Sequence, residues 1–325
     1  MSASIFAFVL FILGGITYWF YLSGISSRLK GKQKKQRIWI WLPALSFLVS
    51  TAYFLVSGLN PAYAIILGFG SMFGGFLGSY SFREYHTYAS IFFLSAIMLF
   101  LLTVSGMPAH LLVALGIGIM PALVYFGKSG NLENETKRDA KQVEVRRDII
   151  QIAMGLVTIA IVAYIGAYVQ YLFWISMLIF LGIISTARYP SNGISKAFMS
   201  IEKPYARYGN GGLLLISGSL LIAGFVRQPS YLLFFLSLIL LADPIATIVG
   251  INIGGPKLPY QKKKSVSGTI AFFLFGCIIG YFLVGLYAIP LSLIIGIAES
   301  SSGVLDDNVL ISVLSMALYY LITSL

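Results

Sequence analysis

The sequence predicts an all-α polytopic membrane protein with about 10 to 12 transmembrane helices, some of them broken. The chain has 325 residues, of which 58% are hydrophobic and only 10% charged, and its mean hydropathy is +0.89. This composition is far too apolar for a soluble domain, and apolar stretches close to the length of a membrane span recur along the chain. Most Lys and Arg residues lie in the short segments between these stretches, as in helical membrane proteins.

The expected spans follow from the apolar stretches in order. The first stretch has no basic residues ahead of it, so we interpret it as a retained span rather than a cleaved signal peptide. The stretch at 288–299 is short for a full crossing. The expected spans are 4–24, 38–57, 61–80, 88–106, 108–127, 149–169, 171–187, 211–227, 231–252, 268–286, 288–299 and 308–325.

The basic residues indicate which side of the membrane each loop faces. An even number of crossings with both termini outside leaves Arg227 as the only Lys or Arg outside. The net charge of +11 is therefore a topology signal, and we expect contact with membrane lipids and no nucleic-acid partner. The basic segments that this topology places in the cytoplasm are 28–37, Arg83, 128–147, 188–207 and 257–264.

The longest polar stretch, residues 128–148, divides the chain. It mixes basic and acidic residues, as expected of a solvated cytoplasmic loop or a helix lying on the membrane. We expect an N-terminal transmembrane bundle of unknown role at 1–127 and a second bundle at 149–325. Cys277 is the only cysteine, which excludes an internal disulfide and a cysteine-based metal site.

An acid stands inside one of the apolar spans. Asp243 lies about 13 Å below the expected cytoplasmic end of its span, where an ionised carboxylate costs roughly 2.5 kcal/mol or more on insertion scales. Pro244 follows it, so the sequence predicts a break in the helix, with Asp243 as N-cap and a half-helix starting at Pro244. Broken helices in membranes line cavities, which makes Asp243 a candidate functional residue. The alternative is that Asp243 pairs with a neighbouring helix.

Lysines and the start of the next span follow this acid. Cationic side chains beside a helix N-terminus form an anion site, here a candidate nucleotide site, although lysines in this place also serve as topology signals. The candidate nucleotide-binding residues of this stretch are Lys257, Lys262, Lys263, Lys264, Ser265, Gly268 and Thr269.

A second acidic segment separates the last two spans. Glu299, Asp306, Asp307 and Asn308 can face Asp243 from this segment, and carboxylates so placed suit Mg²⁺. The candidate metal ligands are therefore the four carboxylates, with Asn308 as a weaker candidate. Asp306 or Asp307 could instead cap the last helix.

Two runs of residues carry a resemblance to a known family. D-P-I-A-T-I-V-G from Asp243 and K-L-P-Y-Q-K-K-K-S-V-S-G-T-I-A-F from Lys257 resemble the motif of the CTP-dependent polyprenol kinases, which include phytol kinase and dolichol kinase. That motif has an Asp, a small residue three positions on, a Gly four beyond that, then Gly-x-x-K-x-P and K-S-x-x-G-[ST]-x-A. Ala242 stands where the family usually has Gly, and Ile251 where it often has Arg.

Two further elements are similar to the family and occur in the same order. Arg146-Arg147 resemble its Arg-Lys-x-x-His element, although Gln151 stands where the family often has His. The segment E-S-S-S-G-V-L-D-D-N, which begins at Glu299, is similar to its late acidic segment. The resemblance covers roughly residues 146 to 320. It implies that Arg147 helps to hold phosphates; the alternative is that Arg147 anchors the next span at the membrane surface. Glu202 would be a weaker candidate for a metal or ribose contact, and Arg207 lies in the same loop.

The resemblance implies a membrane lipid kinase that faces the cytoplasm. The γ-phosphoryl group of CTP would pass to the hydroxyl of an isoprenoid alcohol such as phytol, geranylgeraniol or dolichol, with Mg²⁺ as cofactor. Asp243 or Asp307 would take the hydroxyl proton. Three alternatives remain. A CTP-dependent lipid-phosphate cytidylyltransferase would use similar metal and phosphate groups, whereas a prenyl-phosphate kinase would need extra cationic groups for its charged acceptor. A secondary transporter can also have broken helices at its binding site, although we find no inverted repeat. A scaffold or lipid-binding role would not need the acids.

Overall fold

The computed structural model describes residues 41–84, 94, 96–97, 113–119, 140–165, 210–262, 264–302 and 306–324. Within these ranges the elements are helices, and the only extended pairing is a single antiparallel bridge between Lys257 and Ser265. The chain divides into two compact units, Met1–Leu132 and Glu133–Leu325.

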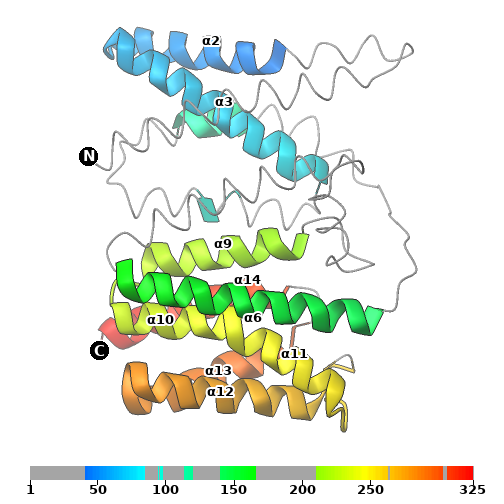
Figure 1. Cartoon of the computed structure of the whole chain (residues 1–325). Coiled ribbons are helices and arrows are strands. Elements are labelled where there is room, and N and C mark those ends of the chain that lie inside the picture. The colour runs from blue at the N-terminus through cyan, green and yellow to red at the C-terminus, as the bar shows by residue number, and fades with distance from the viewer. Residues whose placement is uncertain are drawn as a thin grey trace, which may run out of the picture. The chain divides into compact units, whose positions relative to one another are not determined.

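The described helices of the first unit include a hairpin of α2 (Trp41–Val56) and α3 (Pro61–Glu84) (Figure 1). Asn60 Oδ1 accepts a hydrogen bond from the Ala62 backbone N–H at 2.9 Å, and Pro61 is the first residue of α3, as expected for a capped helix start. A Cβ added to Gly68 would lie 2.3 Å from Thr51 Oγ1, so the bare glycine lets the two helices touch.

The second unit holds the acidic and basic residues of interest. Its described elements, shown in green to red in Figure 1, are α6 (Ala140–Ile165), α9 (Asn210–Phe225), α10 (Pro229–Ser237), the π-helical turn η3 (Leu238–Ala242), α11 (Asp243–Asn252), α12 (Val266–Val284), the short 3₁₀ turn η4 (Gly285–Tyr287), α13 (Ala288–Ser300) and α14 (Asp307–Ser324). Helix α11 packs against α12 and α6, and α14 packs against α9 and α13. Helix α6 begins at Ala140, inside the polar stretch 128–148 and nine residues before the expected start of the span at 149.

Five helical segments of the described residues are long and apolar enough to cross a membrane. The chain is therefore an all-α polytopic membrane protein, as the sequence predicted. Other expected spans, such as 4–24 and 171–187, lie outside the described residues. The five segments are Pro61–Gly78, Val143–Ile165, Pro229–Asn252, Val266–Ser300 and Asp307–Ser324.

The segment Val266–Ser300 folds back on itself. Gly285 has φ +64°, a backbone conformation that favours glycine, and it ends α12. A Cβ on Gly276 would lie 2.5 Å from Ser292 Oγ, and one on Gly280 would lie 2.6 Å from the Ala288 Cβ. These contacts pair α12 and α13 in opposite directions, so the start of α12 and the end of α13 lie at the same end of the hairpin.

The span that contains Asp243 does not stop there. Asp243 has helical backbone angles, φ −61° and ψ −53°, and no side-chain cap bond forms at the start of α11. The predicted N-cap is therefore wrong: the helix continues from α10 into α11 through η3. Proline usually breaks a helix because it lacks an N–H and its ring clashes with the preceding turn. A wider π-helical turn lies directly before Pro244 and leaves room for the ring.

Candidate active site

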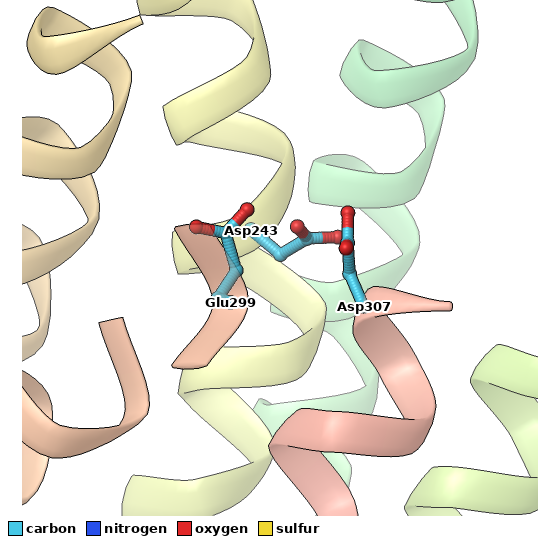
Figure 2. Close-up of side chains that lie close together, drawn as sticks. All are labelled: Asp243, Glu299 and Asp307. Carbon is cyan, nitrogen blue, oxygen red and sulfur yellow. The ribbon is translucent and has the colours of Figure 1, made fainter. Parts of the chain in front are cut away.

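Three carboxylates converge at the junction of α11, α13 and α14 (Figure 2). Asp243 is the first residue of α11, Glu299 lies in the last turn of α13, and Asp307 is the first residue of α14. One carboxylate oxygen from each lies within 4.8 Å of those of the other two. Glu299 is buried, with 4% of its surface exposed, whereas Asp243 and Asp307 are partly buried. We call these three residues the carboxylate cluster.

Lys264 supplies positive charge to the carboxylate cluster. Its Nζ donates to the Glu299 carboxylate and to the Glu299 backbone oxygen at 2.6 Å, and lies 3.1 Å from Asp307 Oδ2. Burial lowers the pKa of the Lys264 ammonium, but the carboxylates of Glu299, Asp307 and Asp243 outweigh this effect and raise the pKa above its ordinary value. Lys264 is therefore a permanent cation at neutral pH.

A tight loop after α11 brings Lys264 to this position. Gly254 and Gly255 have φ values of +68° and +102°, which turn the chain back. The Leu258 N–H then bonds to Lys264 O at 3.1 Å, closing a small hairpin. Tyr260 and Gln261 fix this hairpin to the end of α13: the Tyr260 hydroxyl lies 2.9 Å from Ser300 Oγ, and Gln261 Nε2 donates to Ser302 O. The sequence carried no signal for these two contacts.

The lysines between α11 and α12 do not all lie on one surface. Lys264 points into the carboxylate cluster, whereas Lys257 and Lys262 have exposed side chains. Lys263 lies outside the described residues. The partly buried Lys264 and the exposed Lys257 and Lys262 therefore have separate roles in the site.

The start of α12 uses its polar groups mostly within the protein. Ser265 is the N-cap, and its Oγ accepts from the Gly268 N–H at 3.2 Å. The Val266 N–H bonds to Pro256 O at 3.0 Å, and Thr269 Oγ1 bonds to Ser265 O at 3.3 Å. The N–H groups of Gly268 and Thr269, two residues that the sequence assigned to phosphate binding, thus already have partners in this structure, Ser265 Oγ and Ser265 O.

Asp306 and Asn308 flank the carboxylate cluster without joining it. Asp306 Oδ1 accepts from the Asn308 backbone N–H at 3.0 Å and from Asn308 Nδ2 at 2.8 Å, which is how an acid caps a helix. Asn308 Oδ1 is buried and accepts no hydrogen bond from the residues that the structure describes. The cap interpretation thus describes Asp306, and Asp307 is the acid that faces the site; its Oδ1 accepts from Ser302 Oγ.

Helix α6 brings a further ion pair close to this site. Arg147 Nη2 lies 2.7 Å from Asp148 Oδ1, and Asp148 is only 1% exposed. Both residues are within electrostatic range of Asp243. Sequence reasoning missed Asp148 because it placed residue 148 in the polar stretch before the span; the available signal was an acid directly after Arg147, at the start of an apolar span. Glu202 and Arg207 lie outside the described residues.

The chain is distantly similar to a known plant enzyme. Over 166 residues the chain is 26% identical to phytol kinase 1, chloroplastic, of Arabidopsis thaliana. The match covers 49% of this chain and 54% of the relative, so the chain spans about half the length of the curated relative that it matches. No family model matches the chain, and no solved structure matches it. The similarity supports a lipid-kinase-like function in general, in a membrane protein.

Proposed function

We propose that the chain is a membrane lipid kinase that transfers the γ-phosphoryl group of a nucleoside triphosphate, CTP by resemblance, to the hydroxyl of a prenol. The observation that carries the proposal is the convergence of Asp243, Glu299 and Asp307 on one point beside Lys264. The distant similarity to phytol kinase 1 supports the same class of reaction.

The carboxylate cluster fits a divalent cation. Neighbouring ligands of an octahedral Mg²⁺ lie about 3 Å apart and opposite ones about 4.2 Å, so the three oxygens, which lie within 4.8 Å of one another, would draw together around a shared ion. The buried Oδ1 of Asn308 is a further hard oxygen next to Asp307 in sequence. Mg²⁺ bound here would neutralise phosphate charge and orient the triphosphate.

The cationic residues would share the triphosphate between them. Lys264 forms ion pairs with Glu299 and Asp307, so its ammonium lies beside two of the negative charges of the carboxylate cluster. An arriving triphosphate offers it competing oxygens, while the exposed Lys257 and Lys262 can attract the nucleotide from water. Lys263 and Arg147 remain proposed phosphate contacts.

Asp243 is our candidate for the proton acceptor. Both oxygens of Asp307 are already engaged, one by Ser302 Oγ and the other by Lys264, so Asp307 is less free to accept a proton. In the reaction the prenol oxygen attacks the γ-phosphorus, and the bond to the oxygen bridging the β- and γ-phosphorus atoms breaks. The hydroxyl proton passes to Asp243, and the nucleoside diphosphate leaves.

The test is phosphoryl transfer by the purified full chain in liposomes with Mg²⁺. Triphosphates labelled in the γ position and prenols from farnesol to dolichol should give a labelled lipid monophosphate, with CTP as the best donor. Release of pyrophosphate with a CDP-lipid would instead identify a cytidylyltransferase, and label accepted only by a prenyl phosphate would identify a prenyl-phosphate kinase. Solute movement across the liposomes without transfer to any lipid would identify a transporter.

A further inference from the structure

The π-helical turn before Asp243 leaves one backbone carbonyl without its usual helix partner. The Asp243 N–H bonds to Leu238 O, five residues back, which is the π-helical register. In the same register the next donor would be residue 244 and the acceptor Ile239 O. Pro244 has no N–H. Ile239 is fully buried, so water does not replace the missing donor.

Gln151 of α6 supplies a donor at this carbonyl. Its Nε2 lies 3.4 Å from Ile239 O, a long hydrogen bond between residues far apart in the chain. Because Ile239 O can only accept, the side-chain nitrogen of Gln151 must face it. The amide of Gln151 thus takes the place of the backbone N–H that Pro244 lacks.

A second contact of α6 falls on the same turn. A Cβ added to Gly155, four residues after Gln151, would lie 3.0 Å from Leu240 O and 2.9 Å from Leu241 Cδ2. Residues four apart lie on one face of a helix, so Gln151 and Gly155 together seat α6 on η3. One residue donates to the turn, and the other leaves room for it.

We propose that Gln151 is a positioning residue that acts through the π-helical turn to aim Asp243 at Glu299 and Asp307. A π-helical turn holds one residue more than an α-helical turn, and each residue accounts for about 100° of rotation. Loss of the turn would rotate Asp243 by about that angle relative to α10 and away from the carboxylate cluster. The role of Asp243 as a metal ligand rests on the proposed function.

The experiment compares variants of the purified full chain. Gln151→Met keeps the length of the side chain and removes the donor, whereas Gln151→His keeps a donor. Each is made alone and together with Pro244→Ala, which restores a backbone N–H. Met154→Leu, on the same helix with an exposed side chain, is the control. The readouts are Mn²⁺ affinity without nucleotide, measured by electron paramagnetic resonance, and kcat and KM for the prenol.

Gln151→Met should weaken Mn²⁺ binding and lower kcat by about tenfold, comparable to the loss of a contact that orients a metal ligand, because Asp243 would turn away from Glu299 and Asp307. KM for the prenol should change less than about twofold. Gln151→His should recover most of the loss, and Met154→Leu should behave as wild type. In the Pro244→Ala background the effect of Gln151→Met should largely vanish, because the restored backbone N–H can donate to Ile239 O.

Unchanged Mn²⁺ affinity in Gln151→Met, or an equal loss with and without Pro244→Ala, would overturn the positioning role. If Gln151→Met fails to fold, Gly155→Ala decides: it crowds the same turn and should lower Mn²⁺ affinity, and no change would count against the proposal. Wild-type protein that binds Mn²⁺ but phosphorylates no alcohol would refute the kinase proposal, while the metal-binding results would still judge Gln151.

Discussion

Lys264 Nζ lies 3.1 Å from Asp307 Oδ2 and also donates to the side chain and backbone of Glu299. One ammonium therefore connects the start of α12 with the end of α13 and the start of α14. It stabilises two of the three acids of the carboxylate cluster before any metal or nucleotide is present.

Lys264 and Lys262 should differ sharply in their effect on stability. Lys264→Met leaves the buried Glu299 carboxylate without its cation and should destabilise the protein by about 3 kcal/mol. Lys262→Met removes an exposed charge and should leave the thermal midpoint in detergent unchanged. Adding Glu299→Gln to Lys264→Met should restore part of the loss. Equal midpoints for the two single variants would contradict the buried ion pair.

Metal and Lys264 should compete for the same carboxylates. In folded Lys264→Met protein, Mn²⁺ should bind more tightly without nucleotide than in wild type, because the ammonium no longer neutralises Glu299 and Asp307. Asp307→Asn in the wild-type background should bind Mn²⁺ more weakly. Titration followed by electron paramagnetic resonance measures both. Weaker Mn²⁺ binding in Lys264→Met would show that the ion binds elsewhere.

Substitutions of Asp306 and Asp307 should have different effects, the first on stability and the second on kcat. Asp306→Ala removes the cap of α14 and should lower stability by about 1 kcal/mol while kcat stays near wild type. Asp307→Asn should lower kcat strongly with a smaller change in the thermal midpoint, because it alters the carboxylate cluster. A loss of kcat with Asp306→Ala as large as with Asp307→Asn would place Asp306 in the metal site.

Asp243→Asn should fold and fail to transfer phosphate. A neutral amide is cheaper to bury than a carboxylate, so the thermal midpoint should match or exceed that of wild type. Transfer should fall by at least about a hundredfold, because both metal binding and proton acceptance are affected. Near-normal turnover in well-folded Asp243→Asn protein would remove Asp243 from the mechanism.

Residues 228 and 262 should label from opposite sides of the membrane. Both side chains are exposed, and the apolar segment Pro229–Asn252 lies between them. In a Cys277→Ala background, a cysteine at 262 should react with a membrane-impermeant reagent only from the cytoplasmic side, and one at 228 only from outside. Labelling of 262 from outside would separate the nucleotide site from cytosolic CTP.

Much of the bundle is predictable because span length and charge placement are strong signals. The expected spans 211–227, 268–286 and 308–325 correspond closely to α9, α12 and α14. The residues Asp243, Glu299 and Asp307 stood out because acids near apolar spans are rare. Their order along the chain could not give their distances, which depend on how α11, α13 and α14 pack.

The parts that sequence reasoning missed depend on tertiary contacts. The π-helical turn before Asp243 contacts Gln151 and Gly155 of α6, a helix far from it in the sequence, and local propensity, which pointed to a break, does not include such contacts. Which lysine faces inward depends on the hairpin that Tyr260 and Gln261 attach to α13. Asp148 was missed because the span was expected to start at residue 149. Helix α6 begins nine residues earlier, at Ala140, and therefore includes Asp148.

The position of Asp243 in the chain has a consequence for biosynthesis. The segment Pro229–Asn252 precedes Glu299 and Asp307 in the chain, so we expect it to enter the membrane before α13 and α14 can dock against it. Its mean hydropathy of 2.4 must therefore offset the insertion cost of the acid, about 2.5–3.5 kcal/mol, without help from any partner. The carboxylate cluster and its ion pairs form only when α13 and α14 dock, so a released chain truncated after Asn252 would keep this span yet lack the site.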